Sequence, residues 1–201
     1  MSSLLKLLER TFLIAGVGLI SIATFVHIDA RAHRQMALND FERIRDQVEN
    51  PDAMDDWSEK RKAEYLESVK QDAGATLAVL RVPSRDIEVP VLDSTSDLAL
   101  NRGAGHVEGT ALPGTAGNIA VAAHRDGFFR GLKDIKIGDQ IELTTLEGQQ
   151  TFVVSKLDIV DPFQVSVLDP TDEPVLTLIT CYPFYFVGSA PERFIVRATL
   201  N

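Results

Sequence analysis

Cysteine and basic residues are both scarce in this chain. Cys181 is the single cysteine among 201 residues, which excludes a disulfide within the chain and leaves the thiol available for chemistry. Lys and Arg number 20 against 29 Asp and Glu, giving a net charge of −9. The basic residues form no long cluster, which argues against a nucleic-acid-binding surface. With 45% hydrophobic residues, the chain can still bury the core of one domain.

Residues 11–28 (TFLIAGVGLISIATFVHI) contain no Asp, Glu, Lys or Arg. Eighteen residues of helix reach about 27 Å, close to the hydrocarbon thickness of a bilayer. We therefore expect residues 1–29 to form a cytoplasmic tail and a transmembrane anchor. Basic residues lie on both sides of the stretch, so they indicate its orientation poorly. The alternative is a cleaved signal peptide, since Ala30-Arg31-Ala32 follows the apolar stretch.

Residues 30–73 are rich in charge and predict a helical linker. Met36, Phe41, Ile44 and Val48 recur at three- to five-residue spacing, as on one face of an amphipathic helix. Residues 49–52 (ENPD) interrupt that helix, and a second charged helix is expected to run from about residue 55 to residue 70. The linker is either a stalk that holds the rest of the chain off the membrane or a solvated spacer.

Residues 74–201 have the pattern of a mainly β domain. Short apolar and β-branched runs alternate with Gly, Pro and Asp turn signals, which predicts an antiparallel or mixed barrel. We expect a short helix at 94–101, a helical turn at 128–132, and a long loop at 103–117 that exposes His106 to solvent. The seven expected strands are residues 75–82, 87–92, 118–124, 140–145, 150–159, 175–181 and 193–200.

Three residues at expected strand ends have side chains suited to catalysis. Cys181 ends one apolar run, His124 ends another, and Arg193 begins the last. A thiol at the rim of a rigid sheet can act as a nucleophile if a base and a cation lie nearby. Each residue also has a structural interpretation, because an isolated Cys is often a small core residue, a His can be structural, and an Arg can begin a surface strand.

The sequence around these residues resembles the sortase family of cysteine transpeptidases. Residues 177–181 (TLITC) match the family's T-L-x-T-C signature, residues 122–125 (AAHR) contain a histidine in the expected place, and Arg193 follows the cysteine at a suitable spacing. Residues 109–114 (GTALPG) and 181–184 (CYPF) are most like the class D branch. The resemblance implies a closed eight-stranded β-barrel with short helices and no cofactor. It also implies that Cys181 is the nucleophile, His124 the general acid and base, and Arg193 the group that stabilises the oxyanion.

The same resemblance implies a substrate and a location. A membrane-anchored sortase cleaves an LPxT-like sorting signal through a thioacyl-enzyme intermediate and transfers the protein to an amine acceptor of peptidoglycan or another surface protein. The chain would then cross the bacterial cell membrane once, with its catalytic domain on the extracytoplasmic side. We expect no metal site, because Pro170 and Pro174 interrupt the nearby acidic residues and no Ca²⁺-loop spacing is visible. The candidate substrate-binding residues are Thr180, Phe163, Val165, Val167 and Leu168.

Two other functions fit the same residues. A cysteine peptidase would use the same thiol and histidine but would release its product to water. A non-catalytic, membrane-anchored binding module would need no reactive thiol. The reaction products distinguish a peptidase from a transpeptidase. The reactivity of Cys181 distinguishes a binding module from either enzyme.

Overall fold

The structure is a computed structural model that describes residue 54, residues 57–185 and residues 188–201. The expected membrane anchor and the first helix of the linker lie outside these residues. Within the described part of the chain, no helix is both long and apolar enough to cross a membrane.

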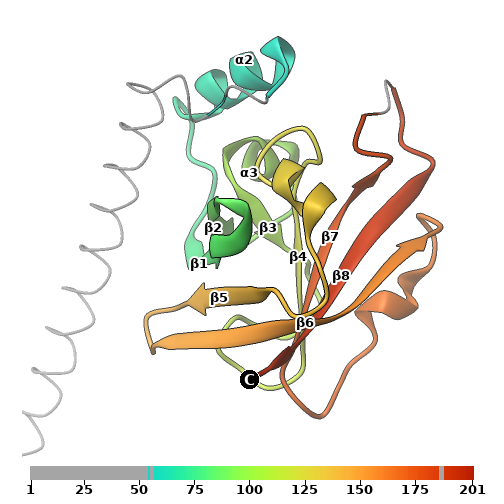
Figure 1. Ribbon diagram of the computed structural model, residues 1–201. Helices are drawn as coiled ribbons and strands as arrows, with labels where there is room; N and C mark the ends of the chain where they lie inside the picture. The colour runs from blue at the N-terminus through green and yellow to red at the C-terminus, as the bar shows by residue number, and fades with distance from the viewer. Residues whose placement is uncertain (1–53, 55–56, 186–187) are drawn as a thin grey trace, which may run out of the picture. The chain divides into compact units, whose positions relative to one another are not determined.

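Eight strands close into a single barrel (Figure 1). Around the barrel they follow the order β1-β2-β3-β4-β7-β8-β6-β5. The family resemblance implied a closed eight-stranded barrel, and this part of the prediction is confirmed. The strands are β1 (Thr76–Val82), β2 (Ile87–Leu92), β3 (Ala104–His106), β4 (Asn118–Ala122), β5 (Gln140–Thr144), β6 (Gln149–Val160), β7 (Val175–Tyr182) and β8 (Glu192–Leu200).

Strand direction explains the two burial patterns in the barrel. Neighbouring strands are antiparallel except in the pairs β2–β3 and β4–β7. β1 and β5 alternate between buried and partly exposed residues, as expected of strands with one face toward the core. β4 and β7 are instead buried along most of their length, which fits their near-continuous apolar sequences. His124 therefore follows a buried strand, and Cys181 lies near the end of the strand that pairs with it.

The prediction for residues 103–117 was wrong in two respects. Residues 104–106 form β3, and the His106 side chain is 5% exposed rather than solvated. Gly105 is required there, because a Cβ at this position would collide with the Ser94 backbone. A three-residue strand with a central glycine lacks the β-branched or aromatic residues that make a strand recognisable in a sequence.

Two short α-helices and three 3₁₀ turns complete the described fold. The α-helices are α2 (Glu59–Ser68) and α3 (Asp97–Arg102). Ser58 and Ser96 cap them, each accepting a hydrogen bond from the backbone N–H three residues later. The 3₁₀ turns are η2 (Pro83–Arg85), η3 (Arg130–Asp134) and η4 (Val165–Leu168). α2 falls within the expected second linker helix, and it belongs to the same compact unit as the barrel.

A buried polar network attaches the β6–β7 connection to the barrel. The Thr177 hydroxyl on β7 donates to Asn118 Oδ1 on β4 at 2.6 Å. Asn118 Nδ2 in turn donates to the carbonyls of Val167 and Asp169, both at 3.0 Å. Asn118 and Thr177 are 2% and 0% exposed, so leaving these groups without partners would cost about 1–3 kcal/mol each. The network thus fixes the position of η4 relative to β4.

Candidate active site

Cys181 and Arg193 are directly opposite each other in the barrel. They are Cα partners in the antiparallel ladder between β7 and β8. Directly opposed residues project from the same face of a sheet with Cβ atoms about 4.5–5.5 Å apart. Both side chains are half-buried, so they remain accessible from the surface. The register therefore places the Arg193 side chain on the same face of the sheet as the thiol.

His124 follows β4, which runs parallel to β7 on the other side of Cys181. The last paired residues are Ala122 and Ile179, and the Ala123 N–H donates to the Ile179 carbonyl at 3.2 Å. Continuing this register by two residues places His124 level with Cys181. The three candidate catalytic residues thus lie on two adjacent strands, β7 and β8, and just after their neighbour β4.

Thr180 holds the two halves of the site together from inside the barrel. It is 2% exposed, and its hydroxyl donates to the Ala123 carbonyl at 2.8 Å. Successive strand residues point to opposite faces, so Thr180 points away from the face that carries Cys181. In this structure its hydroxyl therefore ties the residue before the thiol to the residue before the histidine.

The guanidinium of Arg193 is anchored to backbone carbonyls at the start of β8 and just before it. Its Nη1 donates to the carbonyls of Glu192 at 2.9 Å and Ala190 at 3.3 Å. A guanidinium carries five N–H donors in a planar fork, more than these two bonds require. Arg193 can therefore keep this orientation and still offer donors to a developing oxyanion near Cys181.

The surroundings of His124 favour its neutral form. Burial lowers the pKa of the imidazole, and the positive charge of Arg61 lowers that pKa further. The carboxylates of Asp126, Glu64 and Asp97 act in the opposite direction but do not reverse the shift. At a given pH, His124 is therefore neutral more often than a fully solvated histidine would be.

The β6–β7 connection starts beside Arg193, because Val160 at the end of β6 is the Cα partner of Arg193. Two of its apolar side chains are strongly exposed, with Phe163 at 87% and Val165 at 70%. Val167 and Leu168 are half-buried at the end of η4. Four of the five residues that the sequence suggested for substrate binding therefore form a partly exposed apolar segment that leads away from Arg193.

The acidic residues of the β6–β7 connection lie at the protein surface. Asp169, Asp172 and Glu173 are all exposed to solvent. Across the described residues, no three His, Cys, Asp or Glu side chains are grouped in a way that could hold a metal ion.

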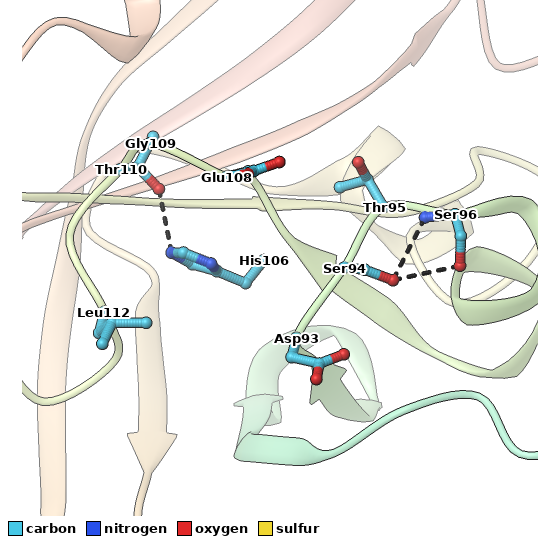
Figure 2. A pocket seen from close by; sticks show the side chains of 9 residues that line it. All are labelled: Asp93, Ser94, Thr95, Ser96, His106, Glu108, Gly109, Thr110 and Leu112. Carbon is cyan, nitrogen blue, oxygen red and sulfur yellow. Dashed lines mark hydrogen bonds between the residues drawn. The ribbon is translucent and has the colours of Figure 1, made fainter.

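A cavity of about 670 Å³ lies elsewhere, between the β2–α3 and β3–β4 connections (Figure 2). It is lined by residues from 93–96 and 106–112, and none of the three candidate catalytic residues contributes to it. Figure 2 shows the His106 ring turned toward Thr110, whose hydroxyl lies 3.1 Å from Nε2. The same Nε2 is 3.0 Å from the Ala111 carbonyl, so these contacts tie β3 to the loop that follows it.

Comparison with known proteins decides the family. The family model of the sortase domain matches residues 80–201, which is more than half of the chain. The chain belongs to the sortase family. Curated sortases that it resembles include sortase D of Bacillus subtilis, 35% identical over 130 residues that cover 64% of this chain and 66% of that protein. Sortase A of Bacillus anthracis is 28% identical over 172 residues, covering 77% of this chain and 80% of the relative.

Solved sortase structures share the fold. Sortase A from Corynebacterium diphtheriae, a lid mutant, has a TM-score of 0.59 at 27% identity, covering 66% of this chain and 73% of the other. A Clostridium perfringens sortase D5 transpeptidase has a TM-score of 0.59 at 24% identity, covering 77% and 94%. The predicted resemblance to sortases, and to their class D branch, is confirmed. Sortases are cysteine transpeptidases, so the chain belongs to a family of enzymes.

Sequence reasoning missed a residue that organises this sortase site. Arg125 directly follows His124, and its Nη1 and Nη2 donate to the carbonyls of Pro183 at 2.8 Å and Gly188 at 3.0 Å. It therefore links the segment that carries His124 to the connection between Cys181 and Arg193. Its position next to His124 was the only sequence signal, and its partners lie about 60 residues further along the chain.

Proposed function

We propose that this sortase is a membrane-anchored cysteine transpeptidase that cleaves an LPxT-like sorting signal and joins the protein to an amine of the cell envelope. The observation that carries the proposal is the arrangement across three strands, with Cys181 opposite Arg193 on one side and level with His124 on the other. A nucleophile, a proton carrier and an oxyanion donor are the groups that acyl transfer requires.

In the first step, the Cys181 sulfur attacks the carbonyl carbon of the scissile peptide bond. A C–S bond forms while the carbonyl oxygen gains negative charge, which Arg193 stabilises by hydrogen bonding. The C–N bond then breaks, and the leaving nitrogen takes a proton from His124, which had received it from the thiol. The products of this step are a thioacyl-enzyme and a free amine.

In the second step, an acceptor amine attacks the thioacyl carbon. His124 takes a proton from the attacking nitrogen, the C–S bond breaks, and the proton returns to the Cys181 sulfur. One residue has to act in both directions because the reaction is nearly symmetric. The lowered pKa of His124 suits this role, since a mostly neutral imidazole is ready to accept the proton of either nucleophile.

The proposed substrate groove is the apolar segment formed by Phe163, Val165, Val167 and Leu168. Two exposed apolar side chains on the connection that starts at the Cα partner of Arg193 fit the leucine and proline of an LPxT-like signal. The class D resemblance favours signals that end in Thr-Ala or Thr-Gly. Thr180 was also a candidate for substrate contact, but its buried hydroxyl supports a bracing role instead.

The reaction products test the proposed activity. The purified chain is mixed with an LPxTA or LPxTG peptide, with and without glycine amide as the amine, and the products are weighed by mass spectrometry. We expect the N-terminal peptide fragment joined to glycine amide, together with a thioacyl adduct on Cys181. Release of the acid alone, even at high amine concentration, would establish a peptidase. No cleavage and no adduct with either peptide would favour a binding module.

The proposed location rests on residues 11–28, which lack Asp, Glu, Lys and Arg and are long enough to cross a bilayer. We propose that they anchor the chain in the bacterial cell membrane in a single pass, with residues 74–201 on the extracytoplasmic side. Full-length protein should then stay in the membrane fraction after a high-salt wash and keep its N-terminal sequence. A mature N-terminus at His33 would show cleavage after Ala32 and refute the anchor.

A further inference from the structure

Helix α2 is attached to the turn that follows His124. Arg61 of α2 is buried on this side, with its side chain 13% exposed. Its Nε donates to Asp126 Oδ1 at 3.2 Å, and its Nη1 donates to Asn101 Oδ1 of α3 at 2.6 Å. Glu64, one turn further along α2, lies 2.8 Å from the same Nη1 and helps to hold the guanidinium in place. One side chain thus joins α2, α3 and the His124 turn.

An aromatic cluster makes a second attachment to the same turn. Trp57 meets Phe128 edge to face with ring centroids 4.8 Å apart. Tyr65, which is 1% exposed, contacts both rings at 5.8 and 6.0 Å. Such aromatic pairs contribute about 0.5–1.5 kcal/mol each beyond their buried area. The polar and the aromatic contacts both reach residues 126–128.

This turn closes directly on His124. The N–H groups of Gly127 and Phe129 both donate to the His124 carbonyl at 3.3 Å. A Cβ placed on Gly127 would lie 3.5 Å from Arg61 Cδ and 3.8 Å from His124 Cβ, so the Arg61 stem and the histidine pack against the same glycine. A displacement of α2 would therefore be transmitted to the backbone of His124.

We propose that Arg61 is a positioning residue for His124, which it orients through Asp126 and to which it presents a positive charge. The inference rests on the proposed transpeptidase function, in which His124 carries the proton. Arg61 acts through the histidine alone and not on the thiol or the substrate. α2 thereby becomes part of the catalytic apparatus, although the sequence suggested only a linker.

The charges around His124 also couple it to Arg61. Arg61 lowers the pKa of His124, whereas Asp126, Glu64 and Asp97 raise it, and burial has the largest effect. The ionisable groups that act on the histidine are Arg61 and Glu64 on α2, Asp97 on α3 and Asp126 in the turn. Arg125 adjoins it in the chain, and Cys181 lies level with it on β7. Removing one charge at Arg61 or at Asp126 should therefore shift the pKa of His124 in opposite directions.

The test compares Arg61→Gln, Arg61→Lys and Asp126→Asn with a control, Lys60→Gln. The control removes the same charge from the same helix at a side chain that is 85% exposed. The imidazole of His124 is titrated by NMR in full-length protein that also carries Cys181→Ala, and His124→Gln assigns its signal. We expect the pKa of His124 to rise in Arg61→Gln, to stay near the parent value in Arg61→Lys, and to fall in Asp126→Asn.

Kinetics of the variants with Cys181 intact provide the second measurement. Arg61→Gln should lower kcat by about 10-fold or more with little change in KM, since small misplacements of a catalytic group have costs of this size. Its pH profile should shift in the limb that reports His124. Arg61→Lys should keep the parent pH profile while losing part of kcat, because an ammonium group cannot replace the fork.

The outcomes are separable. The inference is overturned if the pKa of His124 and the kcat of Arg61→Gln and Asp126→Asn are the same as those of Lys60→Gln. Lower melting temperatures with unshifted His124 titrations would also overturn it, since they would show a structural role only. If the parent enzyme fails to join peptide and amine, the proposed function fails, yet the opposite pKa shifts would still establish the coupling of Arg61 to His124.

Discussion

Cys181→Ala should abolish both transpeptidation and hydrolysis, with a loss of at least ~10³-fold in kcat. The change removes the only thiol of the chain, so no other cysteine can replace it. Cys181 is half-buried near the end of β7, and stability should change by less than about 1 kcal/mol. The measurement is product formation by mass spectrometry, alongside the melting temperature.

The thioacyl adduct gives this prediction an internal control. The parent enzyme should gain the mass of the acyl fragment when it meets a signal peptide, and the Cys181→Ala protein should bind the peptide without gaining mass. Turnover above a few per cent in the variant would remove Cys181 from the role of nucleophile. The candidate site on β4, β7 and β8 would then lose its central group.

Arg193→Lys should lower kcat/KM by about 10²–10³, equivalent to roughly 2.7–4 kcal/mol of transition-state stabilisation. Lysine keeps the charge but lacks the planar fork, which in Arg193 binds the Ala190 and Glu192 carbonyls and in the proposed mechanism also binds the oxyanion. Steady-state kinetics on the signal peptide measures the effect. The melting temperature should change little, because the residue is only half-buried.

Arg197→Lys is the matched control for this change. Arg197 lies four residues further along β8, so its side chain leaves the same face of the sheet, but its partner on β7 is Thr177 instead of Cys181. We expect near-normal kinetics for Arg197→Lys. Equal kinetics for the two variants would refute the oxyanion role of Arg193, whereas a raised KM with unchanged kcat would assign it to ground-state binding.

Seven of the eight strands could be predicted from the sequence because their residues have the apolar pattern and the β-propensity of a strand. β1 and β5 alternate buried and partly exposed residues, and β4 and β7 are continuous apolar runs. β3 could not be predicted, since Ala104, Gly105 and His106 have no strand preference of their own. That strand exists because β2 and β4 bind it from either side.

The contacts that support the candidate site could not be predicted from the sequence either. Arg61 acts through Asp126, 65 residues later, and Asn118 reaches the carbonyl of Val167, 49 residues later. The sequence of a charged helix does not indicate which distant carboxylate one of its basic residues will bind. The expectation of a solvated linker for α2 followed from its composition, whereas its buried Tyr65 and its largely covered Arg61 show contacts that composition does not encode.

By itself, the sequence determined which residues were available for catalysis and where most strands run. One cysteine, a histidine and an arginine stood at strand ends, and strand preference is a local property of the chain. Only the tertiary structure decided that Cys181 faces Arg193 and lies level with His124, and that α2 holds the turn after that histidine. The physical reason is that barrel closure fixes the register between strands far apart in the chain, and a shift of one residue would turn each side chain to the opposite face.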